Sequence, residues 1–206
     1  MYIPDYYKNE DRAEIEAFLK ANAFGILVNV LDGKPWATHV PLELVESSTD
    51  GKQFLVAHVS KENPQWTAFS AGDEVLVIFT GPHAYVSSSW YDFEGVPTWN
   101  YTAVHVYGKP RILDESETIA SLKTLVDKYE AGRDNPTRVE DLSKKTMMMV
   151  RGIVAFEIEI TRIEAKKKHS QNRDAKNYQS VIAHLEASAD PNAKAIAAEM
   201  KRKRKS

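Results

Sequence analysis

Short runs of β-forming residues, separated by tight turns, fill the first half of the chain and restrict what it can fold into. Residues 24–31 are apolar and β-branched, and the Asp32-Gly33 pair that follows is typical of a two-residue hairpin turn. The same pattern predicts five further strands, at 36–45, 53–59, 74–80, 84–88 and 98–107. Strands this closely spaced favour an antiparallel barrel over a parallel sheet with helical crossovers.

Helical periodicity dominates the second half, where apolar residues recur every three or four positions. The helical pattern predicts helices at 115–131, 139–150, 174–188 and 192–203, and two shorter ones in the first half at 11–21 and 64–70. One more strand is predicted at 152–163. The chain is therefore expected to be mainly β with helices, an α+β protein. We expect one domain over residues 1–165 and a helical extension over 166–206, ending in the basic tail Lys201–Lys205.

Composition narrows the classes of function. The 206 residues include 27 Lys and Arg against 29 Asp and Glu, and this near balance does not suggest a dedicated nucleic-acid binder. The chain has no cysteine, so disulfides and Cys-ligated metals are excluded. None of the six histidines forms an HxH or HExxH pattern, so no metal site is expected. Without a signal peptide or a long apolar run, a soluble cytoplasmic protein with no membrane contact is expected.

Two polar residues, Thr38 and His39, interrupt an otherwise apolar strand. An ordinary in-and-out alternation explains them as well as contact with a ligand does. The two interpretations stay open at this point.

The segment from His58 to Trp66 runs from the end of a strand into the start of a helix. Backbone N–H groups at a helix start are unpaired and favour anions. Ser60, Lys61 and Asn63 would add donors for a phosphate, and Trp66 would wall a planar ring. A plain capped turn, with Asn63 as the N-cap, is the competing interpretation.

Aromatic residues concentrate between positions 81 and 107. Period two places Trp99, Tyr101, His105 and Tyr107 on one face of the strand predicted at 98–107. Such a face suits either a ligand pocket or burial against another subunit.

The last polar segment is Lys166–Arg173, directly after the strand predicted at 152–163. Gln171 and Asn172 carry amides of the kind that read the edge of a heteroaromatic ring. Its three consecutive lysines are expected to be a solvated run.

Six segments, in one order along the chain, together resemble the PaiB family. They are Met1-Tyr-Ile-Pro, Thr38-His-Val-Pro-Leu, His58-Val-Ser-Lys-Glu-Asn-Pro-Gln-Trp, Gly81-Pro-His-Ala-Tyr-Val-Ser-Ser-Ser-Trp-Tyr, Pro97-Thr-Trp-Asn-Tyr-Thr-Ala-Val-His-Val-Tyr-Gly and Ser170-Gln-Asn-Arg. The resemblance extends to about Met200. Members are described as FMN-binding negative transcriptional regulators, linked in bacilli to protease synthesis and sporulation. The family is similar to the pyridoxamine phosphate oxidase-like split barrels, in which two subunits pair and the flavin lies between them.

The resemblance implies a homodimer with FMN as its cofactor, held by residues from several segments. The implied contacts are Thr38, His39 and Val40 on one strand, His58, Val59, Ser60 and Lys61 on the next, Asn63, Gln65 and Trp66 at the phosphate end, Trp99, Asn100 and Tyr101 from the partner's side, and Gln171 and Asn172 at the ring edge. The sequence departs from the family at His169, where a leucine is usual, at Ser88, where a proline is common, and at Lys61-Glu62, where other members carry varied residues.

Three functions follow as hypotheses. The first is a regulator of the PaiB type, although the chain shows no DNA-reading module, so DNA and a regulatory protein both remain candidate partners. The second is a flavin-dependent oxidoreductase or flavin reductase, in which His105, Tyr85 or Tyr101 would act near the ring. The third is a dimeric scaffold that has lost its cofactor.

Overall fold

The computed structural model describes residues 1–203, apart from the side chains at 70, 71 and 203. Arg204 and Lys205 of the predicted basic tail lie outside the described residues. The chain forms two compact units. Unit 1 comprises Met1–Phe18, Phe79–His105 and Glu164–Ser206, and unit 2 comprises Leu19–Ile78 and Val106–Ile163. The boundary predicted between residues 165 and 166 falls close to the point where the chain passes from unit 2 to unit 1, and it stays a prediction.

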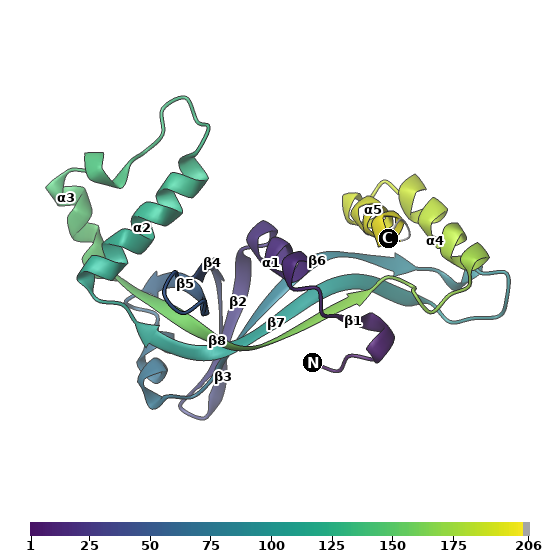
Figure 1. Cartoon of the computed structure of the whole chain (residues 1–206), viewed down its shortest axis with the longest axis horizontal. Coiled ribbons are helices and arrows are strands. Elements are labelled where there is room, and N and C mark those ends of the chain that lie inside the picture. The colour runs from purple at the N-terminus through teal and green to yellow at the C-terminus, as the bar shows by residue number, and fades with distance from the viewer. Residues whose placement is uncertain (204–206) are drawn as a thin grey trace. The chain divides into compact units, whose positions relative to one another are not determined.

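Unit 2 is built on a sheet whose strands follow the order β3-β2-β6-β7-β8-β5-β4. The strands are β2 (Phe24–Leu31), β3 (Lys34–Pro41), β4 (Glu43–Glu46), β5 (Gln53–Ser60), β6 (Val75–Val86), β7 (Thr98–Ile112) and β8 (Ile153–Lys168), and the last three continue into unit 1 (Figure 1). The two ends of this order, β3 and β4, are separated in the chain by Leu42 alone. The sheet path therefore returns to where it began, as a barrel requires.

The hairpin between β2 and β3 forms as its turn residues predict. Asp32 and Gly33 both have positive φ, 51° and 73°, which is the geometry of a two-residue turn that matches strand twist. The strands then pair along their whole length, from Leu31 opposite Lys34 to Phe24 opposite Pro41.

Alternate residues of these strands fill the interior of unit 2. On β5, Leu55, Ala57 and Val59 are buried, whereas Val56 and His58 are only half-buried and Ser60 is exposed. Further members of this core are Leu27, Val40, Leu42, Phe69, Val77, Val106, Phe156 and Ile158.

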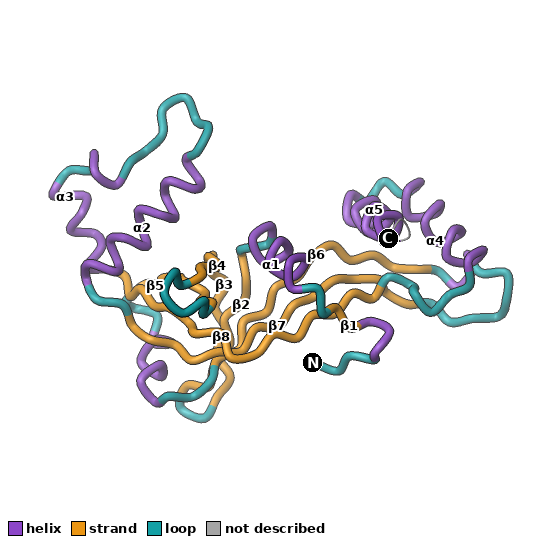
Figure 2. The backbone as a smooth tube through the Cα atoms, in the orientation of Figure 1, coloured by secondary structure: helices purple, strands orange, loops and turns teal. Residues whose placement is uncertain are grey.

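Helix α2 (Glu115–Glu130) begins with a capping box. The Asp114 side chain accepts from Glu117 N, and the Glu117 side chain accepts from Asp114 N. Between α2 and β8 the chain is mostly loop and short helix: η4 (Val139–Asp141), α3 (Lys144–Met147) and η5 (Met148–Gly152) (Figure 2). The single helix predicted at 139–150 is therefore wrong, because Ser143 caps a new helix by accepting from Thr146 N.

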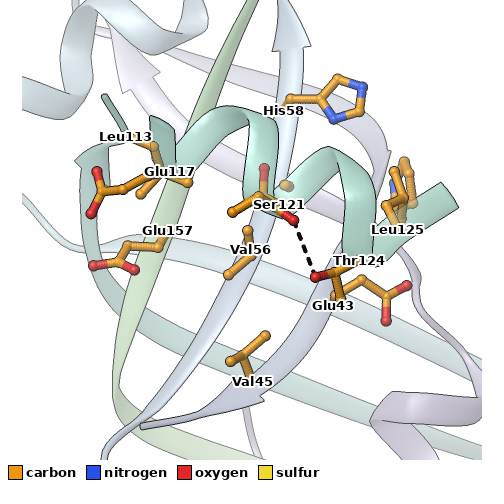
Figure 3. Close-up of a pocket in the computed structure, with 13 residues that line it drawn as sticks. Glu43, Val45, Val56, His58, Leu113, Glu117, Ser121, Thr124, Leu125 and Glu157 are labelled. Carbon is orange, nitrogen blue, oxygen red and sulfur yellow. Dashed lines mark hydrogen bonds between the residues drawn. The ribbon is translucent and has the colours of Figure 1, made fainter. Parts of the chain in front are cut away.

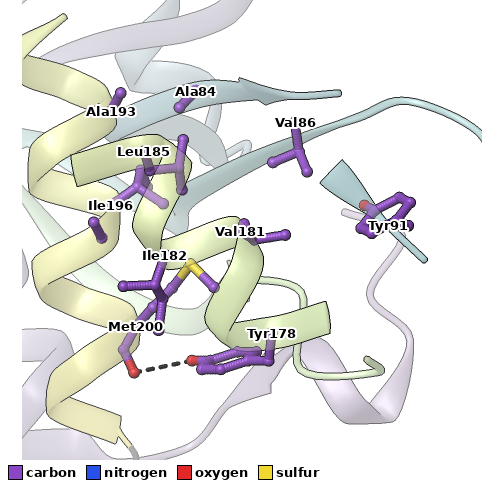
Figure 4. Close-up of a cluster of buried hydrophobic side chains, with 11 residues drawn as sticks. Ala84, Val86, Tyr91, Tyr178, Val181, Ile182, Leu185, Ala193, Ile196 and Met200 are labelled. Carbon is purple, nitrogen blue, oxygen red and sulfur yellow. Dashed lines mark hydrogen bonds between the residues drawn. The ribbon is translucent and has the colours of Figure 1, made fainter. Parts of the chain in front are cut away.

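Unit 1 contains η1 (Asp5–Tyr7), β1 (Lys8–Asn9), most of α1 (Arg12–Ala21), η3 (Ser88–Trp90), α4 (Ala175–Ala187) and α5 (Pro191–Lys203). Its core forms where α4 and α5 pack against each other and against residues 84–91 (Figure 4). The Tyr178 hydroxyl donates to the Met200 carbonyl at 2.9 Å, which joins the two helices. The cluster consists of Ala84, Val86, Tyr91, Tyr178, Val181, Ile182, Leu185, Ala193, Ile196, Ala197 and Met200.

The strands of unit 1 differ from the prediction in two ways. The strands expected at 74–80 and 84–88 are one continuous strand, β6. Gly81 lies within this strand, where the Cβ of any side chain would be 2.7 Å from Phe18 Cε2 and would collide with that ring. β8 continues to Lys168, so the lysine run is not a solvated loop. Lys167 is 3% exposed and pairs with Glu14 and Glu199.

No helix among residues 1–203 is long and apolar enough to cross a membrane.

Candidate functional site

The loop after β5 is fixed by Asn63, which leads into η2 (Pro64–Ala71). Asn63 Oδ1 accepts from Gln65 N at 3.1 Å, the N-cap bond expected before Pro64. Asn63 Nδ2 donates to Thr38 Oγ1 at 2.9 Å. This bond brings the predicted site residues of β3 and of the loop together. The capped turn and a ligand role are compatible, since the cap uses only the amide oxygen.

Gln65 anchors the same loop from inside. Its side chain is fully buried, and Nε2 donates to Leu27 O and to Asn29 Oδ1, both at 3.1 Å. Asn29 Nδ2 donates in return to Gln65 O at 3.3 Å. Because its amide nitrogen is already bonded within the barrel, Gln65 holds the loop in place. Its predicted contact with a cofactor stays a prediction.

Ser60 and Lys61 are exposed at the end of β5. The backbone around them is held on both sides: Lys61 N donates to Gly152 O at 2.8 Å, and Trp66 Nε1 donates to Lys61 O at 3.1 Å. The ammonium group of Lys61 has no carboxylate partner among the described residues. A fixed backbone with a free cation is a suitable arrangement for an anion.

His58 lies on the outer side of β5 and lines a cavity of about 280 Å³ between β5 and α2 (Figure 3). Burial lowers the pKa of His58, so its imidazole is neutral at pH 7. Val56 and Leu125 supply apolar walls. Thr124 Oγ1 donates to Ala120 O at 3.1 Å, so its hydroxyl is bonded within the helix.

Carboxylates at the rim of this cavity are already paired. Arg111 donates to both Glu117, at 2.8 and 3.0 Å, and Glu157, at 2.8 Å. These bonds hold the pKa of Glu117 at about 2. Glu43 pairs with Lys128 at 2.5 Å. The cavity therefore presents apolar surface and a neutral imidazole rather than free negative charge.

The remaining residues predicted for unit 2 divide by side. His39 is exposed and its ring lies 6.2 Å from that of Phe24, whereas Val40 and Val59 are buried in the barrel core. For Val40 and Val59, only backbone groups remain for the predicted cofactor contacts.

Five predicted site residues lie in unit 1. Trp99 is 52% exposed, and its ring is 6.0 Å from those of His83 and Tyr85. Asn100 is fully buried, where its Nδ2 lies 3.0 Å from Ser170 Oγ, and Lys166 Nζ lies 5.3 Å from the centre of the Tyr101 ring.

Gln171 and Asn172 make bonds within unit 1. Gln171 Oε1 accepts from His169 N, and its Nε2 donates to Lys167 O, so this amide closes its own loop. Asn172 is exposed and accepts from the Tyr7 hydroxyl at 3.3 Å. Their contacts with a flavin ring stay predictions.

The comparisons with known proteins decide the family. Residues 1–162 match the family model described as "Putative FMN-binding domain". The chain belongs to this family. It is 45% identical over 206 residues to "Protease synthase and sporulation protein PAI 2" of Bacillus subtilis, covering 100% of this chain and 99% of that protein. The resemblance to the PaiB family is confirmed.

Two solved structures share the fold of this family member. The FAD and heme binding protein from Mycobacterium smegmatis superposes with a TM-score of 0.63 at 20% identity, over 84% of this chain and 79% of that one. The flavocytochrome Anf3 from Azotobacter vinelandii gives 0.62 at 16% identity, over 86% and 78%. The predicted class, a split barrel of mainly β structure with helices, is confirmed.

Proposed function

We propose that the chain binds FMN, with the phosphate at the end of β5. The observation that carries the proposal is Lys61, a cation without a carboxylate partner among the described residues, on a backbone fixed by bonds to Gly152 and Trp66. Membership of the FMN-binding family supports it.

The donor set fits the phosphate group of FMN. A phosphate monoester carries a charge near −2 at pH 7 and accepts several hydrogen bonds. Lys61 offers an ammonium, Ser60 an exposed hydroxyl, and the Asn63–Thr38 pair a fixed polar surface beside them. When bound, FMN would supply redox chemistry, while the residues of this chain bind and orient it.

A titration of the purified protein with FMN, followed by flavin fluorescence, tests the proposal. Lys61→Ala is expected to weaken FMN binding about tenfold, the effect of losing one charge-assisted contact. Lys34→Ala is the matched control, because Lys34 is an exposed lysine at the β2–β3 turn. A protein that is colourless and binds no added FMN would reject the proposal and favour the cofactor-free scaffold.

We propose a regulatory role of the PaiB type on the strength of the Bacillus subtilis relative, whose name refers to protease synthesis and sporulation. Among the basic residues at the C-terminus, Lys201 pairs with Glu186 and Arg202 with Glu199. The chain shows no DNA-reading module, so we propose a regulatory protein rather than DNA as its partner. Mobility shifts at low salt test this, and binding of DNA by the purified protein would contradict it.

We also propose that the chain is a homodimer, as the PaiB resemblance implies, and that it is cytoplasmic. Exposed aromatic rings such as Trp99 and Tyr85 are suitable for burial in an interface. Light scattering on the FMN-loaded protein should give twice the chain mass, and a monomer at micromolar concentration would count against the dimer.

An FMN-dependent oxidoreductase is the second candidate, and His105 favours it. Burial lowers the pKa of His105, and its Nδ1 has no hydrogen-bond partner among the described residues. A neutral, partly buried imidazole of this kind is suitable for proton transfer. Bleaching of bound FMN by NADH or NADPH would support this activity, and a flavin that stays oxidised with both donors would count against it.

A further inference from the structure

A second hollow of unit 2, here called the basic groove, lies beside the first turns of α2. It has a volume of about 580 Å³ and is bordered by α2, α3, η5 and the end of β5. Lys61, Lys144 and Arg151 line it. Lys144 and Arg151 lie outside the predicted strands and outside the six segments that resemble the PaiB family, so the sequence alone did not mark them as site residues.

The three cations of the basic groove have no carboxylate partner among the described residues. Elsewhere in unit 2, Lys123 pairs with Asp127 and Glu140. Like charges that share a hollow repel one another, and an anion placed among them relieves that repulsion.

Two carboxylates also border the basic groove, Asp114 and Glu115. The Asp114 side chain accepts from Glu117 N at 2.8 Å and from the Ser116 hydroxyl at 3.0 Å, so it is committed to capping α2. Glu115 is exposed in the first turn of α2, where the helix dipole favours a negative charge. Cations therefore outnumber carboxylates, and the better-fixed carboxylate is already bonded.

Local structure fixes the backbone that carries the three cations of this hollow. The bond from Lys61 N to Gly152 O ties the end of β5 to the residue directly after Arg151. Lys144 is the first residue of α3, which Ser143 caps. Ile119, Met147 and Val150 add apolar wall, and a less polar surrounding strengthens charge–charge attraction.

We infer that Lys144 and Arg151 join Lys61 in binding the phosphate of FMN. The inference rests on the proposed FMN-binding function and adds two residues to it. Arginine presents a planar fork that matches phosphate oxygens, and lysine acts as a point charge. These residues select for the phosphate, so the protein prefers FMN to riboflavin, which has the same ring and ribityl chain without the phosphate.

Equilibrium titration with FMN and with riboflavin, read by quenching of flavin fluorescence, tests this inference. Arg151→Ala is expected to raise the Kd for FMN at least tenfold and Lys144→Ala three- to tenfold. The Kd for riboflavin should change less than twofold, so the preference for FMN shrinks by the same factor. Arg151→Lys retains the charge and should recover most of the FMN affinity.

Lys145→Ala provides the matched control. Lys145 is the next residue of α3, is exposed, and does not line the basic groove. It removes the same charge from the same short helix, so an FMN Kd equal to that of the unmodified protein is expected. Far-UV circular dichroism of every variant confirms folding, and Lys144→Ala still tests the inference if Arg151→Ala fails to fold.

The outcomes separate the two proposals. If the unmodified protein binds no FMN, the proposed function fails and the inference with it. If it binds FMN, and Lys61→Ala weakens binding while Arg151→Ala and Lys144→Ala do not, only the inference is overturned. An equal loss of FMN and riboflavin affinity would also overturn it, because the residues would then not act on the phosphate.

Discussion

Gln65 offers the sharpest test of how the loop after β5 is held. In the variant Gln65→Leu the side chain keeps its approximate volume, but Leu27 O and Asn29 Oδ1 each lose a donor 3.1 Å away. Each lost bond costs about 1–1.5 kcal/mol of folding free energy. Gln65 Oε1 is buried without a hydrogen-bond partner among the described residues, so its removal returns about 1 kcal/mol. The expected net loss is about 1–2 kcal/mol.

Gln65→Glu should be worse than Gln65→Leu. At neutral pH it places a buried carboxylate opposite two acceptor oxygens and removes the only donor between them, so we expect a loss above about 3 kcal/mol. The order of the two variants therefore reports on the donor role of Nε2 rather than on side-chain volume.

Urea unfolding followed by far-UV circular dichroism gives these free energies, provided that the m-values agree. Gln179→Leu is the control, because Gln179 is exposed on α4, and its stability should lie within about 0.5 kcal/mol of the unmodified protein. The reasoning is refuted if Gln65→Leu is as stable as this control, or if Gln65→Glu is more stable than Gln65→Leu.

Three further predictions concern stability. Lys167→Met removes the buried cation that pairs with Glu14 and Glu199. Both carboxylates keep Arg202 nearby, so a loss of about 1.5–3 kcal/mol is expected in urea unfolding, and a change below about 0.5 kcal/mol would contradict it. Gly108→Ala places a Cβ 2.3 Å from the Glu159 carbonyl, so a loss of about 2–3 kcal/mol is expected in the same assay, and an unchanged midpoint would show that the strands yield easily. Burial depresses the pKa of His58, so the unfolded chain binds a proton before the folded protein does as the pH falls below about 6.5. The urea midpoint should therefore decline from about pH 6.5 to about pH 5, and it should decline less in His58→Gln. An equal decline of the midpoint with pH in the two proteins would argue against this prediction.

The elements with strong local signals were predictable from the sequence. The hairpin at Asp32-Gly33 needs positive φ at both positions, and few residue pairs other than this one tolerate that geometry. Strand β2 matches its expected range, 24–31, and α2 begins at Glu115 as expected. The cap by Asn63 was also predictable, because it involves neighbours within three residues.

Long strands were harder to predict where their composition changes. β8 begins as an alternating apolar strand and continues through three lysines, which look like a solvated run in isolation. Glu14 and Glu199, which are distant from Lys167 in the sequence, offset the free-energy cost of burying its charge. Whether a charged side chain is buried depends on whether an oppositely charged partner lies beside it in the fold. The local sequence pattern does not identify that partner.

The sequence by itself determined the turns and the strand alternation, because these depend on residues near one another in the chain. Six ordered segments along the chain also identified the FMN-binding family. Only the tertiary structure decided that Gln65 is a buried anchor and that Lys144 and Arg151 share a hollow with Lys61. These three cations come from positions up to 90 residues apart. Their proximity follows from strand pairing between β5 and β8, where Ser60 lies opposite Ile153, and such pairing is fixed by the packing of the whole barrel.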